Sequence, residues 1–305
     1  MLFSWFEVLL LVGVIQGIVT SFLLFKRAKL QVQNRLLGFA ILGFVAVCLK
    51  TVIYSMGLEN SYPWLEYIPL AFETAIAPLI YLYCLSLTEA KFRLTKKEGL
   101  HFVPFVLFML YAIFFYLNAL FADTIEATKL LETSFHLHPV KELEDYFTVV
   151  SIFIYLILGS NVLKKYRKQV NNYTSNNNHS VFGWLRNIQI LMSVLIVFLV
   201  INMLVERVGL IQSNVNVHWK AYFLYIAVVI YYLGIKAVNS SPLIISEANK
   251  KQAKAEVDYY ANDPKAEALA KNIEALIDDK KLYLNPAFSI IELSELLQVN
   301  QSTVS

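Results

Sequence analysis

The chain has 305 residues, of which 57 % are apolar, 14 % are aromatic and only 16 % are charged, with a formal net charge of +3. Ordinary globular chains carry about 25 % charged residues, so this composition leaves too little polar surface to cover a fold in water. The two cysteines, Cys48 and Cys84, both lie inside apolar runs. The composition therefore excludes an ordinary soluble enzyme and a disulfide-stapled domain.

Seven segments are apolar and approach or exceed the roughly 20 residues that a helix needs to cross a bilayer. They are residues 5–25, 36–56, 68–88, 100–121, 146–163, 187–205 and 221–235. The last is short, but Lys220 and Lys236 flank it and can reach the two interfaces. We therefore predict an all-α fold in which residues 1–238 form a seven-helix transmembrane domain.

The connections between these segments differ sharply in their basic residues. The first, third and fifth connections hold thirteen: Lys26, Arg27, Lys29, Arg35, Lys91, Arg93, Lys96, Lys97, Lys164, Lys165, Arg167, Lys168 and Arg186. The other three hold only Lys129, Lys141 and Arg207, apart from Lys220, which directly flanks the last segment. Because loops rich in lysine and arginine stay in the cytoplasm, we predict that the N-terminus faces outward and that the tail from Lys236 onward is cytoplasmic.

The tail differs in character from the apolar part. Residues 239–262 are polar and predict a linker. Asp263-Pro264 is a typical helix start, and its helix has an apolar stripe of Leu269, Ile273, Leu276 and Ile277. Ser289-x-x-Glu292 is the pattern of a capping box for a short helix with Ile290, Leu293 and Leu297 on one side. Gln298-Val299 predicts a turn, and Asn300 is placed to cap a following helix, which together indicate a helix-turn-helix.

The end of the tail resembles the first helix-turn-helix motif of the AraC/XylS family of bacterial transcription regulators. The similarity is carried by Tyr283-x-Asn285-Pro286-x-Phe288-Ser289-Ile290, Leu293-Ser294, Leu297, Val299, Asn300 and Val304-Ser305. Gln298 stands where this family usually has a glycine, which suits a positive φ, and Ser294 replaces a packing alanine. The resemblance implies that residues 263–305 are the N-terminal part of a DNA-binding domain, whose second motif would follow Ser305.

The resemblance assigns the DNA-binding motif to Ser289, Glu292, Leu293, Asn300, Gln301, Ser302, Thr303 and Ser305. Seven spans followed by such a domain are similar to membrane-bound regulators of Bacteroidetes-type bacteria. This implies a sensor in the bacterial inner membrane that responds to a periplasmic or membrane signal and binds DNA without a cofactor. We find no sequence motif of a catalytic site.

A transporter, or a membrane scaffold with a small helical interaction tail, is the alternative reading. Residues 239–305 carry seven Lys and Arg against ten Asp and Glu, whereas proteins that bind nucleic acid usually show a basic face. Against a transporter, the sequence shows neither an internal repeat nor paired interrupted helices. The chain beyond Ser305 separates the two interpretations, because only the regulator requires a second motif there.

Three ionisable residues, Glu7, Lys50 and Glu73, lie within or at the edge of predicted spans, toward the outer side. Such groups are costly in lipid and usually face a cavity or a partner. Glu7, Lys50 and Glu73 are therefore candidates for an outward pocket, in which Lys50 and Glu73 would form a pair. A structural ion pair, or snorkelling at the interface, is the alternative interpretation of these residues.

Two further patterns have two interpretations each. Gly13-x-x-x-Gly17-x-x-x-Ser21 forms a small-residue face suited to close helix approach, within the chain or across a homodimer. His136 and His138 stand in an acidic outer loop, where they fit a metal site less well than an ordinary loop.

Overall fold

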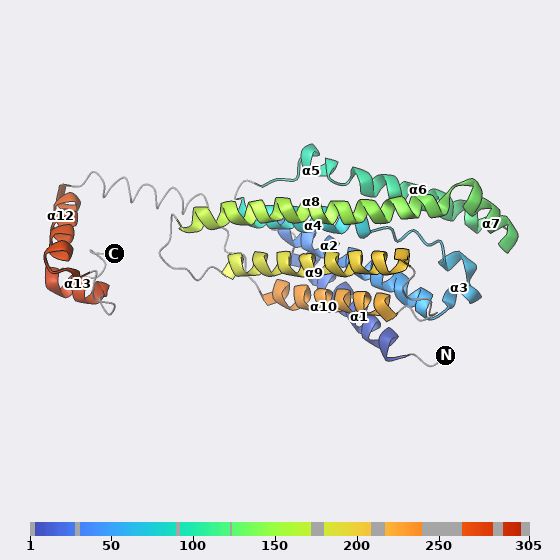
Figure 1. Ribbon diagram of the computed structural model, residues 1–305, viewed down its shortest axis with the longest axis horizontal. Helices are drawn as coiled ribbons and strands as arrows, with labels where there is room; N and C mark the ends of the chain where they lie inside the picture. Colours follow the sequence, from blue (N-terminus) through green and yellow to red (C-terminus); the bar gives the residue numbers. More distant parts are fainter. Residues whose placement is uncertain are drawn as a thin grey trace. The chain divides into compact units, whose positions relative to one another are not determined.

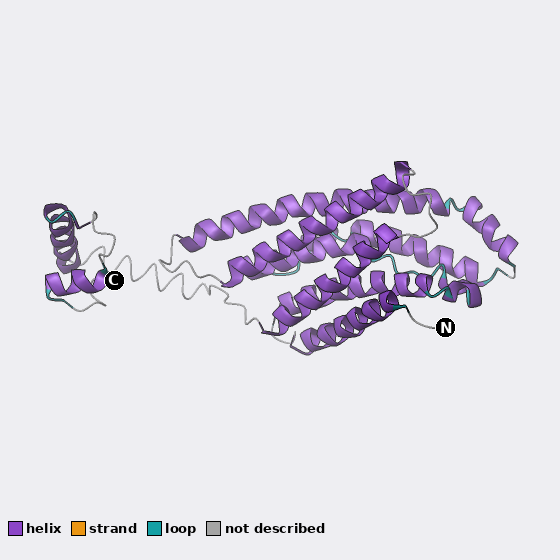
Figure 2. Ribbon diagram, turned by 60° about the horizontal axis from the view of Figure 1, so that its bottom comes forward, coloured by secondary structure: helices purple, strands orange, loops and turns teal. Residues whose placement is uncertain are grey.

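The computed structural model describes residues 4–27, 31–89, 92–122, 124–171, 180–208, 217–239, 264–282 and 289–299. Within these ranges the regular structure is entirely helical, as the sequence predicts (Figure 2). The chain divides into one unit of Met1–Ile244 and another of Ile245–Ser305. The predicted linker, residues 239–262, falls almost entirely outside the described residues.

The first unit is a bundle of long helices joined by shorter ones (Figure 1). The helices are α1 (Trp5–Arg27), α2 (Val32–Ser55), α3 (Leu58–Ser61), the 3-10 helix η1 (Pro63–Leu65), α4 (Glu73–Thr88), α5 (Lys96–Leu100), α6 (Val103–Leu120), α7 (Ile125–Ser134), α8 (Leu137–Asn171), α9 (Ser180–Val208) and α10 (Val217–Asn239). Six of them, α1, α2, α6, α8, α9 and α10, are long and apolar enough to cross a membrane.

The outward faces of these helices are apolar. On α1, Ile15 and Phe22 are 61 % and 66 % exposed, and α6 buries only Ala112 and Phe115 among its eighteen residues. In water such surfaces would drive aggregation, whereas lipid tails solvate them well. These apolar outward faces therefore indicate that the bundle spans a membrane.

The third predicted span is shorter in the structure than in the sequence analysis. Residues 68–88 were expected to form one helix, but α4 begins only at Glu73 and has 16 residues, about 24 Å at 1.5 Å per residue. A hydrocarbon core is about 30 Å thick. The helix packs between α2 and α8, and protein coverage allows an irregular backbone before Glu73 at membrane depth. Among the described residues there are thus six apolar helices long enough to cross a membrane and one short, largely buried apolar helix, α4.

The fifth predicted span is longer than expected. The sequence placed it at residues 146–163, but α8 has 35 residues, about 52 Å, and must extend beyond the hydrocarbon core. The acidic segment expected as an outer loop is instead α7 followed by the first turns of α8. Lys141, Glu144 and Asp145 are therefore held on a rigid helix.

The small-residue face of α1 is a contact within the chain. A Cβ built on Gly13 would lie 3.0 Å from the Cβ of Ala227 on α10. The hydroxyl of Ser21 donates a hydrogen bond of 3.1 Å to the carbonyl of Gly38 on α2. Of the two interpretations of this pattern, the structure supports close approach of α1 to its own neighbours α2 and α10.

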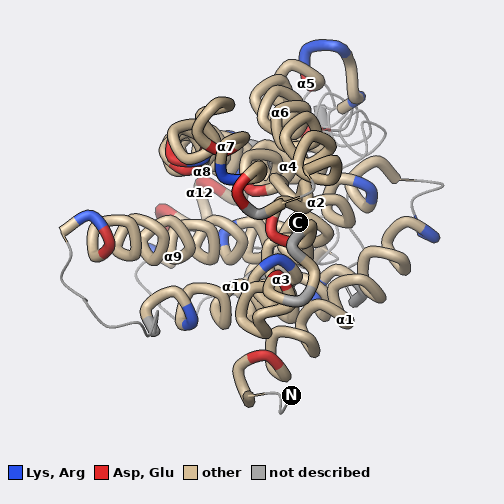
Figure 3. Tube along the Cα trace, turned by 90° about the vertical axis from the view of Figure 1, so that its right-hand side faces the viewer, with Lys and Arg blue, Asp and Glu red and all other residues tan. Residues whose placement is uncertain are grey.

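The charged residues gather at the helix ends (Figure 3). A salt bridge of 3.3 Å from Lys165 to Glu89 joins the C-terminal ends of α8 and α4. We call this the basic end, because it also holds the lysines of α5 and the C-terminus of α1. The opposite, acidic end holds the N-terminus of α1, α3 and α7 (Figure 1); there Arg207 contacts Glu142 at 2.9 Å.

In the second unit, α12 (Pro264–Asp279) begins at the predicted proline. Its expected stripe of Leu269, Ile273, Leu276 and Ile277 is half-buried, while residues 270–272, 274 and 275 are exposed.

The helix α13 (Ile290–Leu297) follows, and the Ser289 hydroxyl accepts a bond from the Glu292 amide. This is one of the two bonds of the expected capping box; the reciprocal bond from the Ser289 amide to the Glu292 carboxylate is not formed. Gln298 adopts the left-handed conformation, with φ 55°, so glutamine occupies the conformation that favours glycine. The tail residues 283–288 and 300–305, including Asn300, Gln301, Ser302, Thr303 and Ser305, lie outside the described residues.

Candidate functional site

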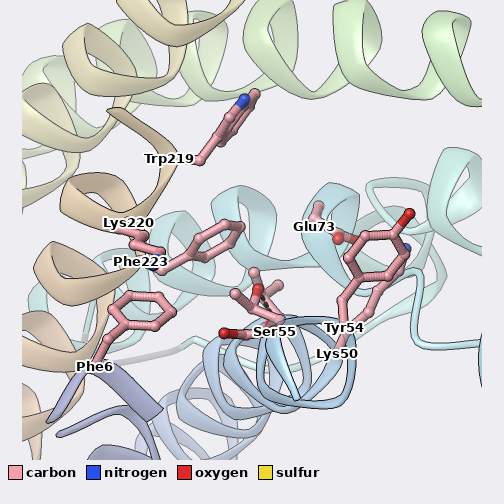
Figure 4. A pocket seen from close by; sticks show the side chains of 10 residues that line it. Phe6, Lys50, Tyr54, Ser55, Glu73, Trp219, Lys220 and Phe223 are labelled. Carbon is pink, nitrogen blue, oxygen red and sulfur yellow. Dashed lines mark hydrogen bonds between the residues drawn. The ribbon is translucent and has the colours of Figure 1, made fainter. Parts of the chain in front are cut away.

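The acidic end of the bundle contains a cavity of about 550 Å³, which we call the Lys50 cavity (Figure 4). Four elements supply its lining: Phe6 from α1; Val47, Lys50, Thr51, Tyr54 and Ser55 from α2; Glu73 from α4; and Trp219, Lys220 and Phe223 from α10. Two of the three residues that the sequence singled out, Lys50 and Glu73, are thus brought to one site.

Lys50 and Glu73 line this cavity without forming a direct ion pair. Among the described residues, neither side chain has a salt-bridge partner within 4.0 Å or a hydrogen bond to another residue. Glu73 is the first residue of α4, where the positive end of the helix dipole stabilises a carboxylate. Lys50 acts on the Glu73 carboxyl group as a nearby opposite charge without contacting it, so both side chains can respond to a molecule that enters the cavity.

Glu7 has a structural position instead. Its carboxylate accepts a hydrogen bond of 2.7 Å from the backbone N–H of Ser4 and another from the hydroxyl of Ser55. It is buried and does not line the Lys50 cavity. Glu7 thus ties the start of α1 to the end of α2, next to the cavity wall formed by Phe6 and Ser55.

The contribution of α10 was not evident from the sequence. Lys220 was expected to be an interfacial anchor, but its ammonium lies over the Phe6 ring, 5.3 Å from the ring centroid, a cation–π distance. Trp219 and Phe223 flank it in the cavity wall. A lysine set among aromatic residues in the first turns of the last apolar helix was the available indication.

A second cavity of about 760 Å³ adjoins the first and shares Val47, Glu73, Trp219 and Phe223 with it. Its other lining residues come mainly from α8 and α9. Several charges near it are paired within the protein: Lys141 with Glu144 at 2.7 Å, and Arg207 with Glu142 at 2.9 Å. Two carboxylates in its lining, Asp145 and Glu206, have no salt bridge among the described residues, so only part of the charge at the second cavity is paired.

The segment before α4, which contains Glu66 and Tyr67, forms a hydrogen bond with α7. The Tyr67 hydroxyl donates a hydrogen bond of 2.8 Å to Glu132, and His138 lies 3.9 Å from the same carboxylate. Burial, and then repulsion from Glu132, raise the pKa of Glu66. Within the described part of the chain, no group of three potential ligands is arranged to hold a metal ion. His138 lies in the first turn of α8, and His136 stands just before that helix with a φ of 55°.

Comparison with known proteins found no matching family model, no similar curated protein and no similar solved structure. The resemblance of the tail to AraC/XylS regulators therefore rests on the sequence motif alone.

Proposed function

We propose that this protein is a membrane-embedded sensor that regulates transcription, with the Lys50 cavity as its signal-binding site and the tail as the beginning of an AraC-like DNA-binding domain. One observation carries the proposal. The helix α10 lines the cavity with Trp219, Lys220 and Phe223, and its other end, at Asn239, leads along the chain into the residues of the helix-turn-helix motif.

The packing of α10 supports this coupling. Its contact with α1 is close, through Ala227 and Gly13, and tightly packed interfaces move between discrete arrangements instead of deforming gradually. A ligand that favours one arrangement shifts the population by its difference in affinity for the two. A complete switch from 1:99 to 99:1 requires about 5.5 kcal/mol, within reach of a few charged contacts.

The local structure of α13 supports the DNA-binding part. Ser289 caps the helix, Leu293 is buried at 8 % exposure, and Gln298 forms the left-handed turn. In such a motif the next residues would read the major groove; here they are Asn300–Ser305, which lie outside the described residues. Phosphate contacts, which the acidic tail lacks, are assigned to the second motif of the family.

The proposed orientation puts the basic end and the tail in the cytoplasm of a bacterial inner membrane, because basic loops are retained there. Reporter fusions after Lys97, Lys168 and Lys236 should then read as cytoplasmic. Fusions after Asn60 and Leu137 should read as periplasmic. A periplasmic result at Lys236 would separate the tail from DNA and overturn the proposal.

Leu293→Asp tests the regulatory role directly. A charge placed on the buried face of α13 should unfold the motif and abolish promoter occupancy by the tagged full-length protein in cells, measured by chromatin immunoprecipitation. Membrane insertion should persist. Leu296→Asp is the matched control, because Leu296 is 41 % exposed and its replacement should leave occupancy intact.

Unchanged occupancy in the Leu293 variant, or no occupancy by the unaltered protein, would contradict DNA binding through this motif. Either result would favour the alternative of a transporter or scaffold with a helical interaction tail.

A further inference from the structure

We infer that the Lys50 cavity binds a small zwitterion of the short-peptide type, with the ligand carboxylate at Lys220 and the ligand ammonium at Glu73. This inference rests on the proposed role of the cavity as the signal-binding site. It is carried by the charges that line the cavity, by their places on two sides of it, and by the aromatic residues in its wall.

Three formal charges line the cavity: Lys50, Lys220 and Glu73. None of them belongs to a salt bridge among the described residues, although Lys141 and Arg207 next door are both paired. Unpaired charges in a partly apolar site are costly. A ligand that brings one charge of each sign would offset that cost, whereas a simple acid or a simple amine would complement only one side.

The charges stand at different places in the cavity. Lys220 lies with Phe6 and Phe223 on one side, and Glu73 lies with Lys50 and Tyr54 on the other (Figure 4). The ammonium and carboxylate of a free amino acid share one carbon, whereas a peptide backbone places its two charged ends about 3.5 Å further apart for each residue. A short peptide therefore suits charges on two different sides of the cavity better than a free amino acid does.

The remaining lining suits such a molecule. Trp219, Phe223 and Phe6 offer apolar and aromatic surface to peptide side chains, and Lys50, Thr51 and Tyr54 offer hydrogen bonds to peptide carbonyls. Lys220 is the fourth residue of α10, and the positive end of the helix dipole there favours an anion beside it. A volume of about 550 Å³ is within the common range for small-molecule sites, about 300–1,000 Å³.

The experiment measures binding of the dipeptide alanyl-phenylalanine to the purified full chain in detergent by isothermal titration calorimetry. N-acetylated and C-amidated forms of the same dipeptide each lose one charge and nothing else of the core structure. We expect each blocked form to bind at least about tenfold more weakly, the loss typical of one charged hydrogen-bonding contact. Equal binding of all three forms, or no binding of the free dipeptide, would overturn the inference.

Two variants assign the ends of the ligand. Lys220→Gln should weaken binding of the free dipeptide about tenfold and erase its advantage over the amide, but not its advantage over the N-acetyl form. Glu73→Gln should do the reverse. Lys236→Gln, at the opposite end of α10 and exposed, should change neither preference. If both cavity variants kept both preferences, the peptide would be bound elsewhere.

Folding and function are controlled separately. Lys220→Arg keeps the positive charge and should retain preference for the free carboxylate, and thermal unfolding of each variant identifies one that has failed to fold. Selective dipeptide binding without promoter occupancy would contradict the proposed regulator but not this inference. Promoter occupancy without selective dipeptide binding would contradict this inference alone.

Discussion

Replacing Gly17 with alanine tests how firmly α1 fixes the position of α10. A Cβ at position 17 would lie 2.4 Å from Cγ2 of Val45 and 2.9 Å from Cγ2 of Ile230, well inside the optimal carbon–carbon separation of about 3.5–4.0 Å. Both neighbours are buried, at 5 % and 0 % exposure, so neither can turn into free space. The helices must separate or the side chains must leave their preferred rotamers, which costs about 1–3 kcal/mol and opposes the gain of about 1 kcal/mol that alanine brings to any helix.

The matched control is Gly183→Ala on α9, where a new Cβ would meet no atom within 4 Å. Alanine is favoured over glycine in a helix by about 1 kcal/mol, so the same chemical change should stabilise this site. Denaturant unfolding of the full chain in detergent micelles measures both changes, and light scattering reports the oligomeric mass. If Gly17→Ala left stability unchanged but dissociated a dimer, the small-residue face would be a contact between chains.

Three further predictions concern other parts of the molecule. Tyr83→Phe should destabilise the bundle by about 1–3 kcal/mol in the same unfolding assay, because the buried indole N–H of Trp184 loses its acceptor at 2.8 Å. Gln298→Gly should stabilise α13 by about 1 kcal/mol, since it removes the strain of a left-handed non-glycine residue, whereas Glu295→Gly inside the helix should destabilise it; hydrogen exchange of the α13 amides measures both. Glu66→Gln should stabilise the fold at neutral pH: folding raises the pKa of Glu66, so its penalty appears as pH rises through the ordinary carboxyl range and persists above the raised value. The advantage of this variant in thermal unfolding should therefore vanish in acid, and an advantage that grew in acid would contradict the assigned cause.

The sequence by itself determined the helical class, the apolar segments that became the long helices, and the contrast between basic and acidic connections. It also located the start of α12 at Pro264 and of α13 after Ser289. These features are local: the length of an apolar run, the charge of a loop, and a capping residue or proline act within a few turns of their own position.

The tertiary structure decided where α4 begins and how far α8 continues. The stretch before Glu73 is apolar enough to be a helix, but cover from neighbouring elements permits an irregular backbone there. The sequence of the first turns of α8 resembles a loop because it contains the charged residues Lys141, Glu144 and Asp145. In the structure these residues are helical, and Lys141 forms a salt bridge with Glu144 within the helix. Neither outcome follows from composition.

The sequence alone also did not reveal the cavity. The Lys220 ammonium lies over the ring of Phe6, although the two residues are near opposite ends of the first unit in the sequence. The Ser55 hydroxyl donates a hydrogen bond to Glu7, which is 48 positions away in the sequence. In a soluble helix, hydrophobic periodicity would show which face is buried. In a membrane helix the lipid-facing and protein-facing sides are both apolar, so periodicity does not reveal the packing. Only the assembled bundle shows which charges share a cavity and which are tied to a neighbouring helix.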